Sequence, residues 1–494
     1  MPEESGPPVS SVTIEARRPL RPLSRLRAEP ILRLDRSRSF PLGQQLVEQL
    51  RSAIVEGSIP PGSRLPSSRA LARECGVSRN LVVSAYDELF AEGYLEGVPG
   101  SGTYVRADLG SMLPATRHRP KPEVQAALVP SATELQDLRI DVGAVEPLSN
   151  KVWRRLWRGA LKQPPPSRYS EPDGDPELRA AVAGYLHRAR GVRCTADDVM
   201  ITSGSLHAID LVARASLGQR RSAAMENPGY PKARAVLARW GAAVLPIPVD
   251  ADGLMVDQLP TREASPALVY VTPSHQFPLG GRLPIARRLR LLEWAGANDG
   301  IILEDDYDSE FRYGSPPLPA LSALDANHSV AYVGTFSKTL SPAMRIGYLI
   351  APRRIRDEIR QVRALSDWHT SWPVQRALAG FIAAGDYDVH IRRMRRVYGQ
   401  RRAALKQVLE SAPDAGTVGG IDAGLHAFWR LNPQVESSAL TRAALNAGIR
   451  VSHAADFYFG GSAVNGVGIG YGAVDLVSLV EAASKLVVLT HSIP

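Results

Sequence analysis

Apolar residues repeat with helical spacing near the beginning of the chain. Leu42, Leu46, Leu50 and Ile54 recur every fourth residue, which puts them on one face of a helix. Gly57 follows the last of them and is typical of a helix end. The pattern therefore predicts an amphipathic helix that packs against the elements after it.

Two shorter helical patterns come next. Ser67 can cap the first, which Gly76 ends, and Ser78 can cap the second, which ends at Gly93. Two short helices joined by a tight turn with glycine form a helix-turn-helix. The segment YLEGVPGSGTYV, at residues 94–105, then predicts two short strands around a Pro-Gly-Ser-Gly turn, which is a hairpin or wing.

Beyond residue 138 the pattern changes to an alternation of strands and helices. Buried strand-like runs such as ALVYVTP, GIILEDDYD and SVAYVGTFS alternate with helical runs such as LRLLEWAGAND. This alternation predicts an α/β domain with a mainly parallel central sheet. Functional sites in such sheets collect at the carboxyl ends of the strands, where the distinctive polar residues of this chain occur.

Two stretches lack any such periodicity. Residues 1–38 are rich in Pro, Ser and Arg, which predicts a largely disordered tail. Residues 107–137 are polar and rich in Pro, which predicts a linker. The expected domains are therefore a DNA-reading unit at 39–106 and an α/β unit at 138–494.

Composition narrows the class of protein without naming its function. Of 494 residues, 44% are hydrophobic and 22% charged, which is ordinary for a globular protein with a sizeable core. The two cysteines, Cys75 and Cys194, offer neither a disulfide framework nor a metal motif, so a cytoplasmic location is expected. No apolar run reaches membrane-spanning length.

Net charge alone does not make the case for nucleic acid. The whole chain carries +9, but residues 1–106 hold 14 arginines and no lysine against 12 acidic residues. The motif must carry that argument. Residues 40–106 resemble the winged helix-turn-helix of the GntR family of bacterial regulators almost throughout. That resemblance implies contact with double-stranded promoter DNA by Arg64, Ser67, Arg69, Ser78, Arg79, Asn80 and Gly100.

The types of these residues suit that role. Arg79 at a helix start can read guanine with two hydrogen bonds, and the two serines and the glycine N–H suit phosphate oxygens. Leu81 stands where many relatives have threonine, so one contact is expected to be absent. A plain helical bundle with exposed arginines is the alternative.

The second unit offers every group that a pyridoxal phosphate site needs. Such a site requires a lysine, a carboxylate for the ring nitrogen, an aromatic ring for stacking, and hydroxyls, helix N–H groups and an arginine for phosphate. The segments TSGSLHA, ENPGYPKA, ILEDDYDSEF and VGTFSKTLSPAMRIGYL supply these types. Along the chain, the helix start with hydroxyls comes first, then the aromatic ring, then the carboxylate, and last the lysine with the arginine. Asp305 and Asp306 are adjacent, so on a strand only one of them can face the ring.

Residues 138–494 resemble the fold-type I pyridoxal-phosphate enzymes, the aspartate aminotransferase superfamily. The resemblance implies that Lys338 forms the Schiff base with the cofactor and Asp305 pairs with the ring nitrogen. It implies that Tyr307 bonds the ring hydroxyl and Tyr230 stacks on the ring. The phosphate would be held by Ser205, Ser337, Arg345 and, across a dimer, Tyr169.

The two halves in this order resemble the MocR subgroup of GntR regulators, but two segments depart from active aminotransferases. SHQFPLGG replaces a segment whose asparagine touches the ring hydroxyl, and either His275 or Gln276 is a candidate substitute. Gly468 stands where aminotransferases carry the arginine that clamps a substrate carboxylate, and residues 451–494 contain no arginine.

The sequence therefore favours a transcriptional regulator that is not an enzyme, with pyridoxal phosphate as the preferred effector and no metal site. The alternatives are an active aminotransferase with a DNA-binding appendage and a constitutive DNA-binding protein with a structural dimerisation domain. A homodimer is expected from the resemblance, and the linker favours head-to-tail exchange, in which each DNA-binding unit rests on the larger domain of its partner. The arginine-rich segment HIRRMRRVYGQRR, at residues 390–402, is expected to be a solvated or salt-bridged helix rather than a further DNA contact.

Overall fold

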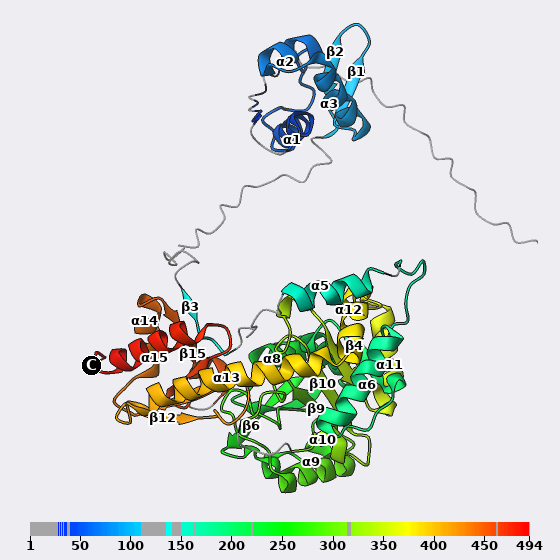
Figure 1. Ribbon diagram of the computed structural model, residues 1–494. Coiled ribbons are helices and arrows are strands. Elements are labelled where there is room, and N and C mark those ends of the chain that lie inside the picture. Colours follow the sequence, from blue (N-terminus) through cyan, green and yellow to red (C-terminus); the bar gives the residue numbers. More distant parts are fainter. Residues whose placement is uncertain are drawn as a thin grey trace, which may run out of the picture. The chain divides into compact units, whose positions relative to one another are not determined.

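The structure is a computed structural model in two units, 1–127 and 128–494, which are described separately (Figure 1). It describes residues 28, 30, 32, 34–36, 40–109, 135–140, 150–162, 164–218, 221–313, 318–460 and 463–493.

The described part of the first unit has three helices and a hairpin. The helices are α1 (Leu42–Val55), α2 (Ser68–Cys75) and α3 (Arg79–Ala91). The hairpin consists of β1 (Leu95–Val98) and β2 (Gly102–Val105), which pair antiparallel. This order confirms the predicted winged helix-turn-helix.

The predicted caps form at the starts of both short helices. The Oγ atom of Ser67 accepts from the N–H of Ala70, and the Oγ atom of Ser78 accepts from the N–H of Leu81, both at 3.3 Å. Gly76 ends α2 with a φ of 63°, a left-handed conformation that glycine adopts without strain. The core between the helices includes the fully buried side chains of Leu46, Leu50, Leu71, Val82 and Leu89.

The second half of the segment that was expected to be a disordered tail packs against the first unit. The N–H of Ala28 donates to the carbonyl of Arg64 at 2.9 Å, and the side chains of Ala28, Leu32 and Leu34 pack against the core of this unit. Gln45 fixes the same segment through two hydrogen bonds with the backbone of Asp35. Isolated apolar residues spaced by prolines and arginines have no periodicity, so their burial left no pattern in the sequence. The rest of the tail and residues 110–134 of the linker lie outside the described residues.

The second unit contains an eight-stranded sheet with the order β4-β11-β10-β9-β8-β5-β6-β7. Five neighbouring strands, β10 to β6 in that order, are parallel, whereas β11 and β7 pair antiparallel with their neighbours. This sheet confirms the predicted α/β fold class. The strands are β4 (Val199–Thr202), β5 (Ser222–Asn227), β6 (Ala243–Asp250), β7 (Gly253–Leu254), β8 (Leu268–Val271), β9 (Ile301–Asp306), β10 (Val330–Thr335) and β11 (Gly347–Ile350).

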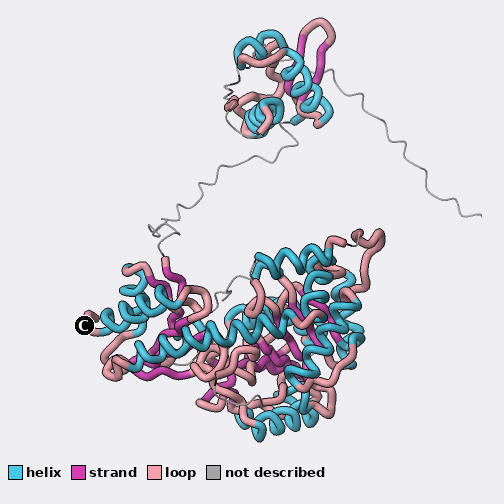
Figure 2. Tube along the Cα trace, viewed as in Figure 1, coloured by secondary structure: helices cyan, strands magenta, loops and turns pink. Residues whose placement is uncertain are grey.

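Helices cover both faces of this sheet, as Figure 2 shows. In β10, Ala331 and Val333 pack on the side of α7 (Ser205–Ser216), α8 (Pro231–Arg239) and α11 (Arg353–Ala364). Val330 and Tyr332 point to the other face. That face is covered by α5 (Asn150–Ala160), α6 (Pro176–Arg190), α9 (Ile285–Asn298), α10 (Leu321–Leu324) and α12 (Trp372–Ala383).

A smaller antiparallel sheet follows, with the order β12-β13-β16-β15. The long helix α13 leads to it and packs on α15 (Figure 1). A short parallel pair, β3 (Gln136–Asp137) with β14 (Ile449–Arg450), shows that this unit begins slightly before residue 138. The remaining elements are α13 (Asp386–Glu410), β12 (Gly416–Gly419), β13 (His426–Leu431), α14 (Ser437–Asn446), β15 (Ser452–His453), β16 (Gly466–Gly470) and α15 (Leu476–Thr490).

Among the described helices, none combines the length and the apolar composition needed to cross a membrane.

Candidate functional site

A cavity of about 250 Å³ opens at the carboxyl ends of β8, β9 and β10. Seven of the ten side chains that the sequence assigned to a cofactor line this cavity. They are Ser205, Tyr230, Asp305, Tyr307, Ser337, Lys338 and Arg345. The sheet topology brings them together because its parallel strands end along one edge.

Asp305 faces this cavity from the end of β9. Its Oδ2 atom accepts from the hydroxyl of Tyr270 at 2.7 Å. Its Oδ1 atom is buried and has no hydrogen-bond partner among the described residues. Burial raises the pKa of Asp305 to about 7, against the opposing effects of the Tyr270 hydrogen bond and the charge of Lys338. One carboxylate oxygen is therefore left for a donor that enters the cavity.

Asp306 points to the opposite face of the sheet, as the alternation of a strand requires. Its Oδ2 atom forms a buried ion pair with Nε of Arg190 at 2.7 Å and accepts from Ser309 and Tyr332. Although burial opposes ionisation, Arg190 and the two hydroxyls hold the pKa of Asp306 below its usual value. The adjacent carboxyls thus have separate environments, and Asp305 alone meets the cavity.

An anion-binding corner lies at the start of α7. Ser205 begins the helix after Gly204, whose φ of 98° is left-handed. A β-carbon on Gly204 would lie 3.5 Å from the guanidinium of Arg345, so the arginine lies directly over the helix start. A helix N-terminus, a hydroxyl and a guanidinium together suit a phosphate.

Lys338 lies in the turn that follows β10. The turn covers residues 337–340, and its N–H at Ser337 donates to Oγ1 of Thr335 at 3.2 Å. The side chain of Lys338 is half-buried and lines the cavity with Asp305. An amine and a carboxylate thus reach the same small space from neighbouring strands.

Aromatic rings form one wall of the cavity. Phe277 makes edge contacts with Tyr230, at 5.5 Å between ring centroids, and with Tyr307, at 5.9 Å. Phe277 comes from the loop in which the sequence suggested His275 or Gln276 as a cofactor contact. Both of those side chains are buried and lie outside the cavity lining.

The reason is visible in their hydrogen bonds. Gln276 donates through Nε2 to the carbonyls of Pro228 and Phe277 and accepts from the N–H of Leu279, so it holds its own loop. His275 binds Asp308 and the backbone of Gly420. In this loop, Phe277 faces the cavity and its polar neighbours point away.

Tyr169 does not reach this cavity within the chain. Its side chain is 86% exposed, and its ring lies 6.2 Å from that of Trp368. An exposed position is what a contact across a dimer interface requires, so the prediction for Tyr169 stays open.

Sequence reasoning missed several residues of the cavity. Tyr270 lies one position before the end of β8, and the strand alternation that turns Asp305 toward the cavity could have indicated it. Lys232 is exposed at the start of α8 and also lines the cavity. The remaining additions are Leu206, Thr272, Phe277, Thr335 and Pro342.

Gly468 lies in β16, and the space that a side chain at this position would need is occupied by Ile140 and Ser452. A β-carbon on Gly468 would lie 2.9 Å from Cγ2 of Ile140 and 3.5 Å from Cβ of Ser452. Ile140 is held there because its N–H donates to Oγ of Ser452 at 3.2 Å. It packs with Phe277 and Phe457 against the cavity tyrosines. An apolar side chain therefore occupies the corner next to Gly468.

In the first unit, the residues assigned to DNA gather around α2, α3 and the wing. The guanidinium of Arg64 lies against the wing, 2.9 Å from where a β-carbon on Gly102 would stand, and this side chain is half-buried. Six are exposed, namely Ser67, Arg69, Ser78, Arg79, Asn80 and Gly100.

Three of the six arginines of α13 make contacts within the second unit. Arg395 donates to the carbonyl of Glu310, Arg401 to that of Gly472, and Arg402 forms an ion pair with Asp422 at 3.0 Å. Arg401 is only 6% exposed. These contacts agree with a salt-bridged helix.

Comparisons with protein families match both units. Residues 42–105 match the family of bacterial regulatory proteins named gntR, and residues 140–464 match the aminotransferase class I and II family. Curated relatives extend over both. The chain is 35% identical to the probable rhizopine catabolism regulatory protein MocR of Rhizobium meliloti, over 92% of this chain and 95% of the relative. It is also 35% identical to the pyridoxine biosynthesis transcriptional regulator PdxR of Corynebacterium glutamicum, over 87% and 92%.

Solved structures match the second unit. A kynurenine aminotransferase of Pyrococcus horikoshii aligns with a TM-score of 0.67 at 25% identity, over 73% of this chain and 92% of that chain. An archaeal alanine:glyoxylate aminotransferase aligns with a TM-score of 0.67 at 23% identity, over 74% of this chain and 93% of that chain. This second likeness shows the shared fold.

The second unit is therefore a fold-type I aminotransferase domain, and the first carries the DNA-binding domain of the gntR regulators. The matched regulators join these domains in the same order over nearly their whole length. The chain belongs to the MocR subgroup of GntR-family transcriptional regulators.

Proposed function

We propose that this regulator binds pyridoxal phosphate in the cavity of its second unit and that the bound cofactor changes its affinity for promoter DNA. The unpartnered Oδ1 of Asp305 carries the proposal. A buried carboxylate oxygen without a donor is costly, and the N–H of a pyridinium ring is the donor that would satisfy it. The protonated ring nitrogen would in turn favour the ionised form of Asp305.

The surrounding residues fit the rest of the cofactor. Ser205, Ser337 and Arg345 would hold the phosphate at the start of α7, and Tyr230 and Tyr307 would contact the ring. Lys338 would present its amine to the aldehyde. When bound, pyridoxal phosphate supplies an electron sink, and the residues of the chain bind it, orient it and keep its ring nitrogen protonated.

The filled corner next to Gly468 favours a cofactor sensor over an amino-acid sensor. An α-carboxylate needs a paired cation, and Ile140 and its aromatic neighbours offer none there. The relative named as a regulator of pyridoxine biosynthesis supports the same effector class. An active aminotransferase with a DNA-binding appendage is the second candidate, favoured only by the complete set of Lys338, Asp305 and Arg345.

Dimerisation belongs to this proposal. Tyr169 is 86% exposed, and under the dimer hypothesis it reaches the phosphate held by a partner subunit. A dimer would also present two winged helices to two half-sites on promoter DNA. Arg79 and Asn80 at the exposed start of α3 would read bases, and Ser67, Ser78 and the wing would contact phosphates.

The test measures binding of the purified regulator to the DNA upstream of its own gene, with and without pyridoxal phosphate and with no amino acid present. We expect the cofactor to change the affinity or the protected region, and Lys338→Ala to abolish the change. The matched control is Lys406→Ala, because Lys406 pairs with Glu410 at the end of α13, outside the cavity lining. Identical binding with and without the cofactor would refute sensing of the cofactor, and a response only to amino acids would assign the site to an amino-acid sensor instead.

A further inference from the structure

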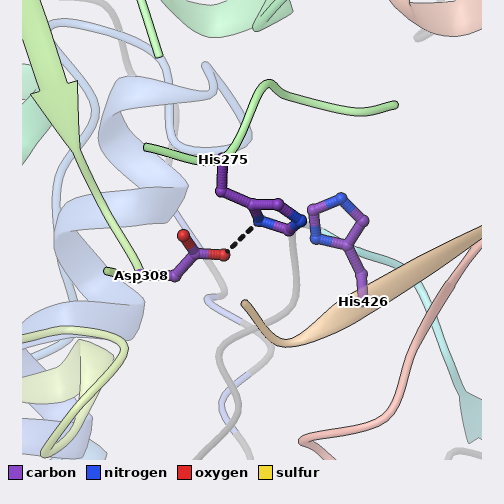
Figure 3. Close-up of side chains that lie close together, drawn as sticks. All are labelled: His275, Asp308 and His426. Atoms are coloured by element: carbon purple, nitrogen blue, oxygen red, sulfur yellow. Dashed lines mark hydrogen bonds and ion pairs between the residues drawn. The ribbon is translucent and has the colours of Figure 1, made fainter. Parts of the chain in front are cut away.

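Three segments of the second unit converge behind the aromatic wall, and His275 lies where they meet (Figure 3). The first is the loop after β8, which carries His275. The second follows β9 and carries Tyr307 and Asp308. The third belongs to the small sheet, with Gly420 in the connection from β12 to β13 and His426 on β13.

His275 forms hydrogen bonds with both of the other segments. Its Nδ1 atom lies 2.9 Å from Oδ2 of Asp308, and its Nε2 atom lies 2.9 Å from the carbonyl of Gly420. The hydroxyl of Tyr307 lies 3.1 Å from both Nδ1 and the carbonyl of His275. His275 is 1% exposed, so water does not compete for these bonds. A cavity residue is thus connected to the small sheet through one side chain.

The hydrogen-bond roles follow from the partners. The Gly420 carbonyl can only accept, so Nε2 of His275 carries a proton, and a second proton on Nδ1 binds the Asp308 carboxylate. Burial lowers the pKa of His275, but the charge and hydrogen bond of Asp308 outweigh it and leave that pKa raised. With Nδ1 protonated, the Tyr307 hydroxyl donates to the carbonyl of His275. The charge of Arg282 also acts on His275 and lowers its pKa, with a smaller effect.

His426 completes the cluster from the side of the small sheet. Its ring lies 4.7 Å from that of His275, and its Nε2 atom donates to the carbonyl of Pro278 at 3.0 Å. Burial, and then the charge of His275, lower the pKa of His426 well below its ordinary value, so this ring is neutral. The carbonyls of Gly420 and Pro278 each bind one nitrogen of the two histidines. These contacts favour a hydrogen-bonded connection between the segments over a metal site.

Glycines make this approach possible. A β-carbon on Gly424, where φ is 73°, would lie 2.2 Å from Oδ2 of Asp308 and 2.3 Å from Cε1 of His275. A β-carbon on Gly280 would lie 2.1 Å from Cα of Gly420. The backbone that leads into the small sheet therefore lies in direct contact with the His275–Asp308 pair. Because the contact is close-packed, a displacement of the pair displaces this backbone, and the reverse also holds.

We propose that His275 is a positioning residue that couples Tyr307, on the wall of the cofactor cavity, to the small antiparallel sheet. This inference rests on the proposed function, because Tyr307 can transmit occupancy of the cavity only if a ligand binds there. A ligand that draws the Tyr307 hydroxyl toward itself weakens its bond to His275 and shifts the contact with Gly420. Coupling of this kind requires that the ligand bind two arrangements of the sheet unequally.

The test measures amide hydrogen exchange of the full chain with and without pyridoxal phosphate, and binding of the cofactor by its visible absorption. In the wild type we expect the cofactor to change exchange in residues 416–431 by about tenfold, the size of change that one rearranged charge-assisted contact produces. In His275→Gln, cofactor binding should persist while that response falls below about twofold. The control is His453→Gln, since His453 is a histidine of the same sheet that binds Ser437 at 3.1 Å instead.

The outcomes separate the two proposals. If the wild type binds no pyridoxal phosphate, the proposed function fails. If it binds the cofactor but exchange in residues 416–431 does not respond, or responds equally in His275→Gln, the inference about His275 is overturned. If His275→Gln does not fold, Asp308→Asn removes the charge with little change of shape, and a full response in that variant overturns the inference. A rise in melting temperature with Zn²⁺ that His275→Gln abolishes would assign the cluster to a metal instead.

Discussion

The hydroxyl of Tyr270 donates to Oδ2 of Asp305 at 2.7 Å, and the other carboxylate oxygen remains without a partner among the described residues. One hydrogen bond is too few to offset complete burial of an ionised carboxyl. The pKa of Asp305 is accordingly raised to about 7 in the ligand-free chain.

The stability of the ligand-free protein should therefore depend on the protonation of Asp305. Its folded pKa of about 7 exceeds the ordinary value of 3.8, so the folded state holds the proton more tightly. Its contribution is complete below about pH 4 and is lost as pH rises to about 7, on the order of 4 kcal/mol in all. Denaturant unfolding of wild type and Asp305→Asn at several pH values checks this. Stability curves that stay parallel across that window would contradict it, and Asp257→Asn, at an exposed site, is the control.

Loss of the buried arginine behind the site should destabilise the second unit strongly. Arg190→Leu leaves Asp306 ionised and buried without its ion pair, which typically costs about 3–5 kcal/mol. Arg290→Leu removes a partner of Asp257 in an exposed pair and should change the unfolding free energy by less than about 1 kcal/mol. Thermal unfolding of the three proteins measures the difference. Equal melting temperatures would show that the Arg190–Asp306 pair does not stabilise the fold.

A side chain at position 468 should be tolerated only when Ile140 is shortened. Gly468→Ala places a methyl group 2.9 Å from Cγ2 of Ile140, and overpacking of this kind costs about 1–3 kcal/mol. Ile140→Ala in the same chain removes the obstructing atoms and should recover most of that loss. A double-mutant cycle from unfolding free energies gives the coupling, and strictly additive effects would mean that the two residues do not compete for space.

Recognition of DNA should depend on Arg79 far more than on another exposed arginine of the same unit. Arg79→Ala removes a side chain at the start of α3 and should weaken binding by about 1–3 kcal/mol, mostly at one base pair. Arg51→Ala is the control, because Arg51 pairs with Glu92 just past the other end of α3. Binding to upstream DNA and to single-base variants, at one fixed salt concentration, measures both. Similar losses for the two variants would contradict the assignment of base reading to Arg79.

Much of the fold followed from periodicity, for physical reasons. The caps at Ser67 and Ser78 and the alternation around Asp305 are local rules, so the sequence alone predicts where those side chains point. Phe277 and Ile140 were beyond such rules. Their positions depend on which neighbour in a loop, or in a segment 312 residues away, fills a given space. The sequence left His275 and Gln276 open as candidates, and neither lines the cavity, because each is bound by a backbone carbonyl remote in sequence.

The segment around Ala28 to Leu34 also bears on how the DNA-binding unit should be isolated. A fragment that begins at residue 39 would discard the apolar contacts of Ala28, Leu32 and Leu34 and leave the two bonds of Gln45 to Asp35 unmade. A small unit buries little apolar surface on folding, so the loss of these contacts should lower its stability noticeably. Fragments for crystallisation or for solution spectroscopy of this unit should therefore begin upstream of Ala28, so that these contacts are kept.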